Sequence, residues 1–503
     1  MHGISRRTLF QGAGVGALLA AWPAYAAGDE ATIGWPSDVP SWDPNLRFVP
    51  DAQSLFKMVF DQPLDQNPKL DLIAHVITKW EMSADGKTLT TELRDDATFH
   101  DGSKLTSADF KYTFFDRIKR GDKIDTANIW RKVNAIDTPS PTQAIMHFDI
   151  PSATAPNWLA FLGSFIVPKD YMNRVGPDGF AAKPVGSGPF KLAEYELNSR
   201  IVLERYDGYW GPKPKLRRIT VQIVKDPSAR VAAVQSGNLD LTINVPIREV
   251  TRLKNQPGLA AEFNPITRVI LLQCRNDLGF ADKNVRLAAH HAIDKKALSQ
   301  AFYAGAAVPL SENAVPGGPG YSADFVFPYD PEMSKALLAK SGYGPDKPVK
   351  IGMATTNGQF PSDYDIARAI VQMWKKVGID ADLDVIEYSK YFELNRGHKL
   401  PETTLYSFDN ATNDPEIWAY TLNPKLPFTP WQGMEIGQKV IDLLSVADNA
   451  QRIAGYKAVL REAVEDGASM PLLQSVQTLV RKASLQFTPY GNGWVLGQTM
   501  SWS

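Results

Sequence analysis

The sequence predicts an α/β protein with two lobes. Its 503 residues are more than one hydrophobic core usually organises. Segments that alternate apolar and polar residues, as strands do, are interspersed with segments of helical periodicity. In the second half a strand (348–355), a helix (364–378) and another strand (379–388) follow one another. This β-α-β order predicts a parallel sheet with a crossover helix, and two α/β lobes, each with its own sheet, are the simplest arrangement.

The first half adds further strands and helices. Residues 88–118 read as a strand, a turn and a capped helix. Alternation continues in the strands 200–210 and 217–224. Residues 226–243 read as a helix that ends at Gly237 and is followed by a strand. Together these segments predict a mixed sheet flanked by helices.

Three helices complete the second half. Residues 284–303 read as one long amphipathic helix, and residues 330–343 as a helix that ends at Gly342. A late helix is expected over 449–468. The chain has no short internal repeats and no low-complexity runs, so nothing favours a repeat architecture.

The N-terminus has the pattern of an export signal rather than of folded structure. Adjacent Arg6 and Arg7 precede a short apolar run (12–22) and a small-x-small end at 24–26. The run is too short to span a bilayer as an anchor. We therefore expect a signal peptide over residues 1–26 of the twin-arginine type, with the general export route as the open alternative.

Charge and cysteine content restrict the class of protein. A formal net charge of −1 argues against a nucleic-acid binder, which needs a basic surface. The single Cys274 lies in the apolar run VILLQC, so we expect a buried, inert thiol and no internal disulfide. A free, soluble protein of the periplasm is the expected product.

No catalytic motif is present. The chain lacks a G-x-S-x-G elbow and an H-E-x-x-H helix. The adjacent His290 and His291 cannot both face the same way on a helix, and the seven histidines form no cluster. We therefore expect no enzyme activity, no catalytic residue, no metal site and no cofactor.

Six motifs in a fixed order resemble one family. The chain is similar to the extracytoplasmic solute-binding proteins, family 5, of bacterial ABC importers, the class that carries peptides, nickel complexes and related solutes. The motifs are WEMSADGKTLTTELRDDATFHDGSKLTSADF (80–110), PVGSGPF (184–190), YDGYW with VAAVQSGNLD (206–210 and 231–240), NVRLAAHHAIDKKAL (284–298), YDPEMSKALLAKSGY (329–343) and DNAQRIAGYKAVLREAVEDGASMPLL (448–473).

The resemblance implies a periplasmic-binding-protein clamshell of type II, cluster C-like. One lobe is then built on a main sheet from residues 27–45, 185–267 and 484–503, with 46–184 as an inserted subdomain. Residues 268–483 form the other lobe, and two crossings near 268 and 483 form a hinge. The ligand is buried between the lobes as they close.

The same resemblance implies the partners. The closed, liganded form docks on membrane permease subunits whose cytoplasmic ATPases supply the energy, so this chain needs no ATP site. We expect a monomer that binds no nucleic acid.

The stretch PVGSGPF raises the question of phosphate binding. A phosphate loop needs backbone N–H groups aimed at one point and normally a following Lys-Ser/Thr pair. That pair is absent, and Pro189 has no N–H. We interpret the stretch as a scaffold turn in which Gly186 and Gly188 can adopt positive φ, with a strand beginning at Phe190.

A closing cleft needs aromatic rings and a few polar anchors. Irregular loops that supply them are expected at 42–53, 355–364, 406–418 and 490–497. The candidate ligand-binding residues are Trp35, Phe48, Asn357, Phe360, Tyr388, Phe408, Asp409, Asn410 and Trp494.

The family resemblance gives Asp409 a role. In peptide-binding members an Asp before an Asn-Gly-Asp-Pro-like turn takes the α-ammonium of the ligand, and Asp409-Asn410 fill that place if Ala411 and Thr412 are an insertion. Dipeptide binders carry an Arg for the ligand carboxylate where this chain has Asn357, and the loop 355–364 has no Lys or Arg. The ligand therefore lacks a carboxylate there or extends past it, because an unpaired buried carboxylate is costly.

The predicted function is the substrate-binding component of an ABC importer for a peptide or peptide-like solute. Longer peptides, amides, opine-like conjugates and neutral solutes such as oligosaccharides stay open as ligands, whereas nickel chelates are not favoured. A ligand carrier for a periplasmic chemoreceptor, a periplasmic hydrolase and a chaperone-like binder are the alternative functions.

Overall fold

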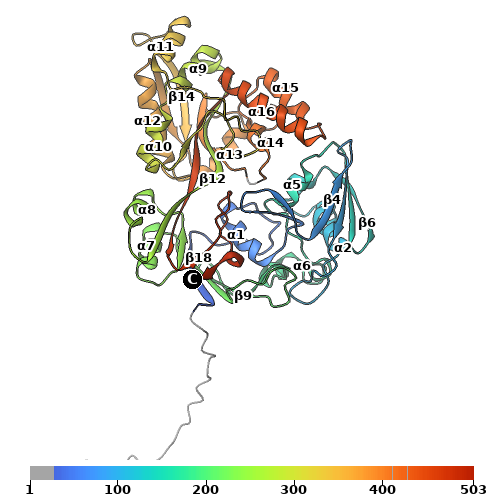
Figure 1. Cartoon of the computed structure of the whole chain (residues 1–503). Coiled ribbons are helices and arrows are strands. Elements are labelled where there is room, and N and C mark those ends of the chain that lie inside the picture. Colours follow the sequence, from blue (N-terminus) through green and yellow to red (C-terminus); the bar gives the residue numbers. More distant parts are fainter. Residues whose placement is uncertain (1–27, 411, 428) are drawn as a thin grey trace, which may run out of the picture.

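A long mixed sheet runs through the molecule. The computed structural model describes residues 28–410, 412–427 and 429–503, and the predicted signal peptide lies outside them. Figure 1 shows an upper body, yellow-green to red, and a lower body, which is blue to green and also contains the dark red C-terminal segment. In spatial order the sheet contains β15 (Ile379–Val385), β14 (Val349–Thr355), β16 (Thr403–Phe408), β12 (Leu259–Cys274), β17 (Ser469–Lys482), β11 (Leu241–Ile243), β1 (Glu30–Trp35), β10 (Arg218–Ile223), β9 (Arg200–Arg205) and β8 (Phe190–Glu196), and β13 (Val308–Pro309) pairs with β17.

The expectation of a separate sheet in each lobe is wrong. Strands β12 and β17 have 16 and 14 residues and pair with each other in antiparallel fashion. Further along the sheet β12 pairs with β16, and β17 pairs with β11. Both strands are long enough to belong to both bodies, so their hydrogen bonds join the two sheets into one (Figure 1).

The upper body contains the predicted β-α-β unit. Strands β14 and β15 are parallel, as predicted, and α12 (Asp363–Lys375) connects them. Its buried face, which includes Ile366, Ile370 and Trp374, packs in the core of this body. Cys274 is buried in the same core, and burial raises the pKa of its thiol to about 12.

The single helix predicted over 284–303 is wrong, because the structure has two. Helix α9 (Lys283–His291) ends before α10 (Lys295–Tyr303) begins. The Asp294 side chain accepts a hydrogen bond from the Ala297 N–H at 2.9 Å. This N-cap starts a new helix inside a run of continuous helical periodicity.

The lower body contains a second sheet and a second core. The antiparallel strands β4 (Ile77–Met82), β5 (Thr88–Leu93), β7 (Gln143–Phe148) and β6 (Val133–Ser140) form it, and a separate hydrophobic cluster packs on it. The predicted strand–turn–helix over 88–118 is present. Thr106 caps α2 (Ser107–Lys111) through a reciprocal capping box with Asp109.

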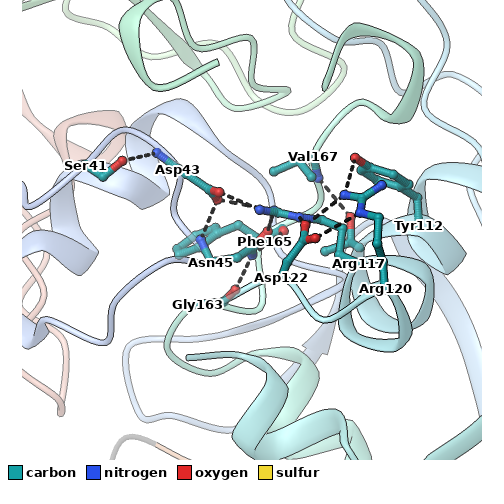
Figure 2. Close-up of polar contacts among 11 residues, drawn as sticks. Ser41, Asp43, Asn45, Tyr112, Arg117, Arg120, Asp122, Gly163, Phe165 and Val167 are labelled. Carbon is teal, nitrogen blue, oxygen red and sulfur yellow. Dashed lines mark hydrogen bonds and ion pairs between the residues drawn. The ribbon is translucent and has the colours of Figure 1, made fainter. Parts of the chain in front are cut away.

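A buried arginine attaches this four-stranded unit to the rest of the lower body (Figure 2). Arg117, which is 1% exposed, donates to Asn45 at 2.8 Å and to Asp43 at 2.6 Å. It also donates to Asp122 at 3.1 Å. Burial alone would lower the pKa of Arg117, but Asp43 and Asp122 raise it above its ordinary value. Asp43 and Asn45 of the predicted loop 42–53 therefore serve this attachment. Residues 50–53 belong to helix α1 (Pro50–Val59), so the expectation of an irregular loop is wrong for them.

The stretch PVGSGPF is a close crossing of chain segments. Gly186 and Gly188 do not have positive φ, so that part of the expectation is wrong. A Cβ on Gly186 would lie 2.0 Å from the Val59 oxygen, and one on Gly188 would lie 2.7 Å from the Val59 carbonyl carbon. The side chain of His100 lies 3.0 Å from the Gly188 oxygen. Glycine is required here by space, and the stretch is scaffold.

Further helices surround the sheets; α8 and α16 contact β17, and α15 packs on α16. Helix α16 is the predicted late helix, and α7 and α11 also occur where they were expected. No helix within the described ranges is both long and apolar enough to cross a membrane. The bounds are α1 (Pro50–Val59), α5 (Ala155–Leu159), α6 (Lys169–Ala182), α7 (Pro227–Gln235), α8 (Ile247–Leu253), α11 (Pro331–Lys340), α13 (Tyr388–Arg396), α14 (Pro415–Ala419), α15 (Met434–Leu443) and α16 (Asn449–Asp466).

Candidate functional site

A cleft of about 740 Å³ lies where the two bodies meet. The lower body contributes the ends of β1 and β11 and the C-terminal segment 492–494. The upper body contributes the β14–α12 loop (357–362), the start of α12 and Asp409, which follows β16. The central strands β12 and β17 line the cleft as well. A volume of this size fits a small solute of several residues or rings.

Two opposite charges meet in the cleft. The Asp409 carboxylate accepts a hydrogen bond from the Thr267 hydroxyl at 3.3 Å. Arg268 lies 3.9 Å from Asp409, and both side chains are 23% exposed. Burial raises the pKa of Asp409, and Arg268 and Thr267 oppose that rise. A cation placed beside this carboxylate would favour its charged form.

Strand register brings these two residues together. Val269 of β12 is paired with Phe408 of β16, so the next positions outward are Arg268 and Asp409. Cross-strand neighbours have Cβ atoms about 4.5–5.5 Å apart. The pair therefore stands at the edge where β12 and β16 open into the cleft.

The β14–α12 loop is held in one conformation by its own polar groups. The buried Asp363 carboxylate accepts hydrogen bonds from the Thr356 hydroxyl at 2.8 Å and from the N–H groups of Gly358 and Gln359, both at 2.9 Å. Gln359 in turn donates to the Ser407 carbonyl at 3.1 Å. The loop is thereby fixed to β16, and its side chains form a preorganised wall.

Five of the nine predicted residues line the cleft: Trp35, Asn357, Phe360, Asp409 and Trp494. The rings are largely buried, with Trp35 1%, Phe360 5% and Trp494 4% exposed, so they form walls. The Trp494 ring also lies 4.4 Å from Lys57 Nζ. Aromatic walls on both bodies suit a ligand with an apolar part.

The other four predicted residues are not among those that line the cleft. Phe48 packs against Gly163, and Phe408 lies in β16 with its ring 6.3 Å from that of Tyr406. Asn410 is fully buried and donates to the Asp414 carbonyl at 2.9 Å, so it shapes the turn before α14. Tyr388 begins α13, and its side chain lies outside the described part of the structure.

Sequence reasoning missed Arg268 and the amides of Asn244, Gln477 and Asn492, which line the cleft. The only signal for Arg268 was a charged residue next to an apolar strand. Within the described ranges no group of three or more His, Cys, Asp or Glu side chains could hold a metal ion.

The two bodies also touch at a rim beside the cleft. Thr154, just before α5, donates to Glu416 of α14 at 2.9 Å. Asn157 donates to the Thr412 carbonyl at 3.1 Å, and Asn413 donates to the Leu70 carbonyl at 3.3 Å. We call these three contacts the closing rim. Burial raises the pKa of Glu416, with Asp414 adding to the rise and Lys132 and Thr154 opposing it.

Comparison with known proteins decides the family. Residues 71–425 match the sequence profile of the bacterial extracellular solute-binding proteins, family 5 Middle. The chain belongs to this family. It is 27% identical over 521 residues to the nickel-binding periplasmic protein of Escherichia coli, with 96% of each chain covered. It is 28% identical to the glutathione-binding protein GsiB of Pectobacterium atrosepticum, with 90% of each covered.

A solved structure supports the fold assigned to this family 5 chain. The periplasmic binding protein DppA from Helicobacter pylori, in complex with the peptide STSA, superposes with a TM-score of 0.78 at 21% identity. The match covers 94% of this chain and 98% of the other. The two-lobed periplasmic-binding-protein fold predicted from the sequence is confirmed.

Proposed function

We propose that this chain is the exported, periplasmic solute-binding component of an ABC importer and that it captures a peptide-like solute with a primary ammonium group. The relatives of the family differ in the solutes they are named for, so the choice rests on the cleft. The observation that carries it is Asp409, a partly buried carboxylate at the cleft wall.

An ammonium group suits this carboxylate. The hydrogen bond that it accepts from Thr267 is long at 3.3 Å, and the guanidinium of Arg268 is 3.9 Å away. Charge-assisted hydrogen bonds are shorter, about 2.7–2.9 Å. A ligand ammonium at that distance would favour the ionised carboxylate, and aromatic walls such as Trp494 would cover an apolar part of the ligand.

We further propose the lobe boundaries predicted above and a cycle in which the ligand shifts the population toward the closed form. The closed form would then dock on a permease with cytoplasmic ATPases. The closing rim supports this cycle because its hydrogen bonds join the two bodies only while they touch.

The test is native mass spectrometry of the purified protein with yeast extract, which is rich in peptides and amino-acid conjugates. The same extract, acetylated with acetic anhydride to block its amines, is the matched control. We expect a retained mass from the untreated extract only. Asp409→Asn should weaken retention about 10- to 100-fold, because a hydrogen bond to a charged group contributes about 1.5–3 kcal/mol.

Asp382→Asn, at an exposed position on β15, is the control variant and should bind like the unmodified protein. Equal retention from both extracts would refute the ammonium anchor. Retention of no solute from either extract would refute the proposed function.

A further inference from the structure

The cleft has one described cation. Among the residues that line it, Arg268 is the sole Lys or Arg. The loop 355–364 has no Lys or Arg, so a ligand carboxylate in the cleft would have Arg268 as its cationic partner. Arg268 comes from β12, the strand that pairs with β16.

Arg268 is held in place but not fully engaged. Its Nη1 donates to the Ser407 hydroxyl at 2.9 Å, and Gln359 also contacts that hydroxyl at 3.3 Å. The ion pair with Asp409 is long at 3.9 Å, beyond the range of a charge-assisted hydrogen bond. A guanidinium carries five N–H donors, and the hydrogen bond to Ser407 uses one of them, so Arg268 can also donate to a ligand.

The position of Arg268 restricts the ligand. Because Arg268 is the cross-strand neighbour of Asp409, its guanidinium donor and the carboxylate acceptor of Asp409 lie side by side on one short stretch of the cleft wall. An extended peptide with normal α-linkages separates its ammonium from its carboxylate by about 3.3–3.6 Å per residue. Such a peptide that places its ammonium on Asp409 carries its carboxylate away from Arg268.

We propose that the cleft recognises a side-chain-linked peptide, whose first residue keeps its α-ammonium and α-carboxylate on the same carbon and joins the next residue through its side chain. The ammonium binds Asp409 and the carboxylate forms two hydrogen bonds with Arg268. The rest of the solute lies along the aromatic walls. This inference rests on the proposed function and narrows its substrate class.

A purely electrostatic role for Arg268 makes a different prediction. If the arginine only balances the charge of Asp409, it affects all ammonium ligands alike. If it binds the carboxylate, it affects the solutes with both charges on one carbon and leaves the others nearly unchanged. Two isomers of one dipeptide separate these cases.

The experiment is isothermal titration calorimetry with γ-Glu-Leu and α-Glu-Leu, which have the same mass, the same formal charges and the same residues. We expect γ-Glu-Leu to bind about tenfold more tightly or better. Arg268→Gln should remove that preference by weakening the γ-isomer. Arg268→Lys keeps the charge without the fork and should retain only part of the preference.

Arg368→Gln, at an exposed position on α12, is the matched control, and the thermal midpoint of each variant checks its fold. Equal or tighter binding of α-Glu-Leu would overturn the inference. So would an equal loss for both isomers in Arg268→Gln. If neither isomer binds while the untreated extract still yields a retained amine, the inference fails and the proposed function stands. If no solute is retained at all, both fail.

Discussion

Removing one hydrogen bond of the closing rim should weaken ligand binding without touching the cleft. The Thr154 hydroxyl donates to Glu416 at 2.9 Å, and Thr154 is 4% exposed. The substitution Thr154→Val keeps the shape of the side chain and removes the donor. Thr154 is not among the residues that line the cleft, so direct contacts with a ligand are unchanged.

The magnitude follows from the kind of bond. A hydrogen bond to a charged group contributes about 1.5–3 kcal/mol. This bond crosses between the two bodies, so its loss destabilises the closed form and leaves the open form unaffected. The apparent dissociation constant scales inversely with the fraction of binding-competent protein. We therefore expect binding about 10- to 100-fold weaker, with the two other rim contacts intact.

The assay is calorimetric titration with the solute identified by native mass spectrometry, alongside small-angle X-ray scattering of the unliganded protein. Thr78→Val is the matched control, because Thr78 donates to the Glu92 carbonyl within the four-stranded unit. A dissociation constant of Thr154→Val equal to that of Thr78→Val would refute the reasoning. So would a weaker binding that comes with a lower thermal midpoint and no change in scattering.

Three further predictions concern stability. Burial lowers the pKa of Lys295 to about 7, so between pH 7 and 10 the unfolded chain binds more protons than the folded one. The free energy of unfolding should therefore rise by up to about 1.4 kcal/mol per pH unit relative to that of Lys295→Met. If urea unfolding gives the same difference in free energy between the two proteins at every pH, the prediction is wrong. Arg117→Met should cost about 3–5 kcal/mol by leaving Asp43 buried without its partner, whereas Arg47→Met, in an exposed pair, should have little effect on the urea midpoint. Gly186→Ala should lower the thermal midpoint by the equivalent of about 1–3 kcal/mol, because its Cβ would meet the Val59 oxygen at 2.0 Å; a drop no larger than that of Gly344→Ala, where no atom lies within 4 Å, would oppose the clash.

Local elements were predictable because their signals are local. The β14–α12–β15 unit was expected within a few residues of its observed bounds, since apolar periodicity and the following glycine mark each change of element. The break between α9 and α10 was missed because helical periodicity continues across it. The N-cap at Asp294 was the available signal, and it was weaker than the pattern around it.

The site was only partly predictable, because the sheet assembles it from distant segments. Asp409 followed from family resemblance, and aromatic residues in loops placed Trp494 at the cleft. Arg268 lies 141 positions before Asp409 in the chain, and only the pairing of β12 with β16 makes them neighbours. Phe408 and Asn410 adjoin Asp409 in sequence, yet alternation along the strand and the turn before α14 direct them elsewhere.

The hinge that the family resemblance predicts near residue 268 and the proposed recognition site share residues. Pro265 is paired with Val476 and Val269 with Gln474, so three residues of β12 stand opposite one residue of β17. This irregularity bends and twists a strand pair, and Pro265 cannot donate to the ladder. Since β12 and β17 run through both bodies, a rotation of one body against the other must pass through this segment.

The three residues of β12 in this segment, 266–268, include Thr267 and Arg268, which are the partners of Asp409. The Thr267 N–H also donates to the Gly491 carbonyl at 2.7 Å, which ties the segment to the C-terminal chain of the lower body. A solute whose α-ammonium binds Asp409 and whose α-carboxylate binds Arg268 would therefore fix the bend of the predicted hinge. The selectivity for the solute and the closing of the cleft would then be coupled at one bulge. Arg268→Gln, which should remove the preference for γ-Glu-Leu, should therefore also reduce the closing of the cleft around that solute.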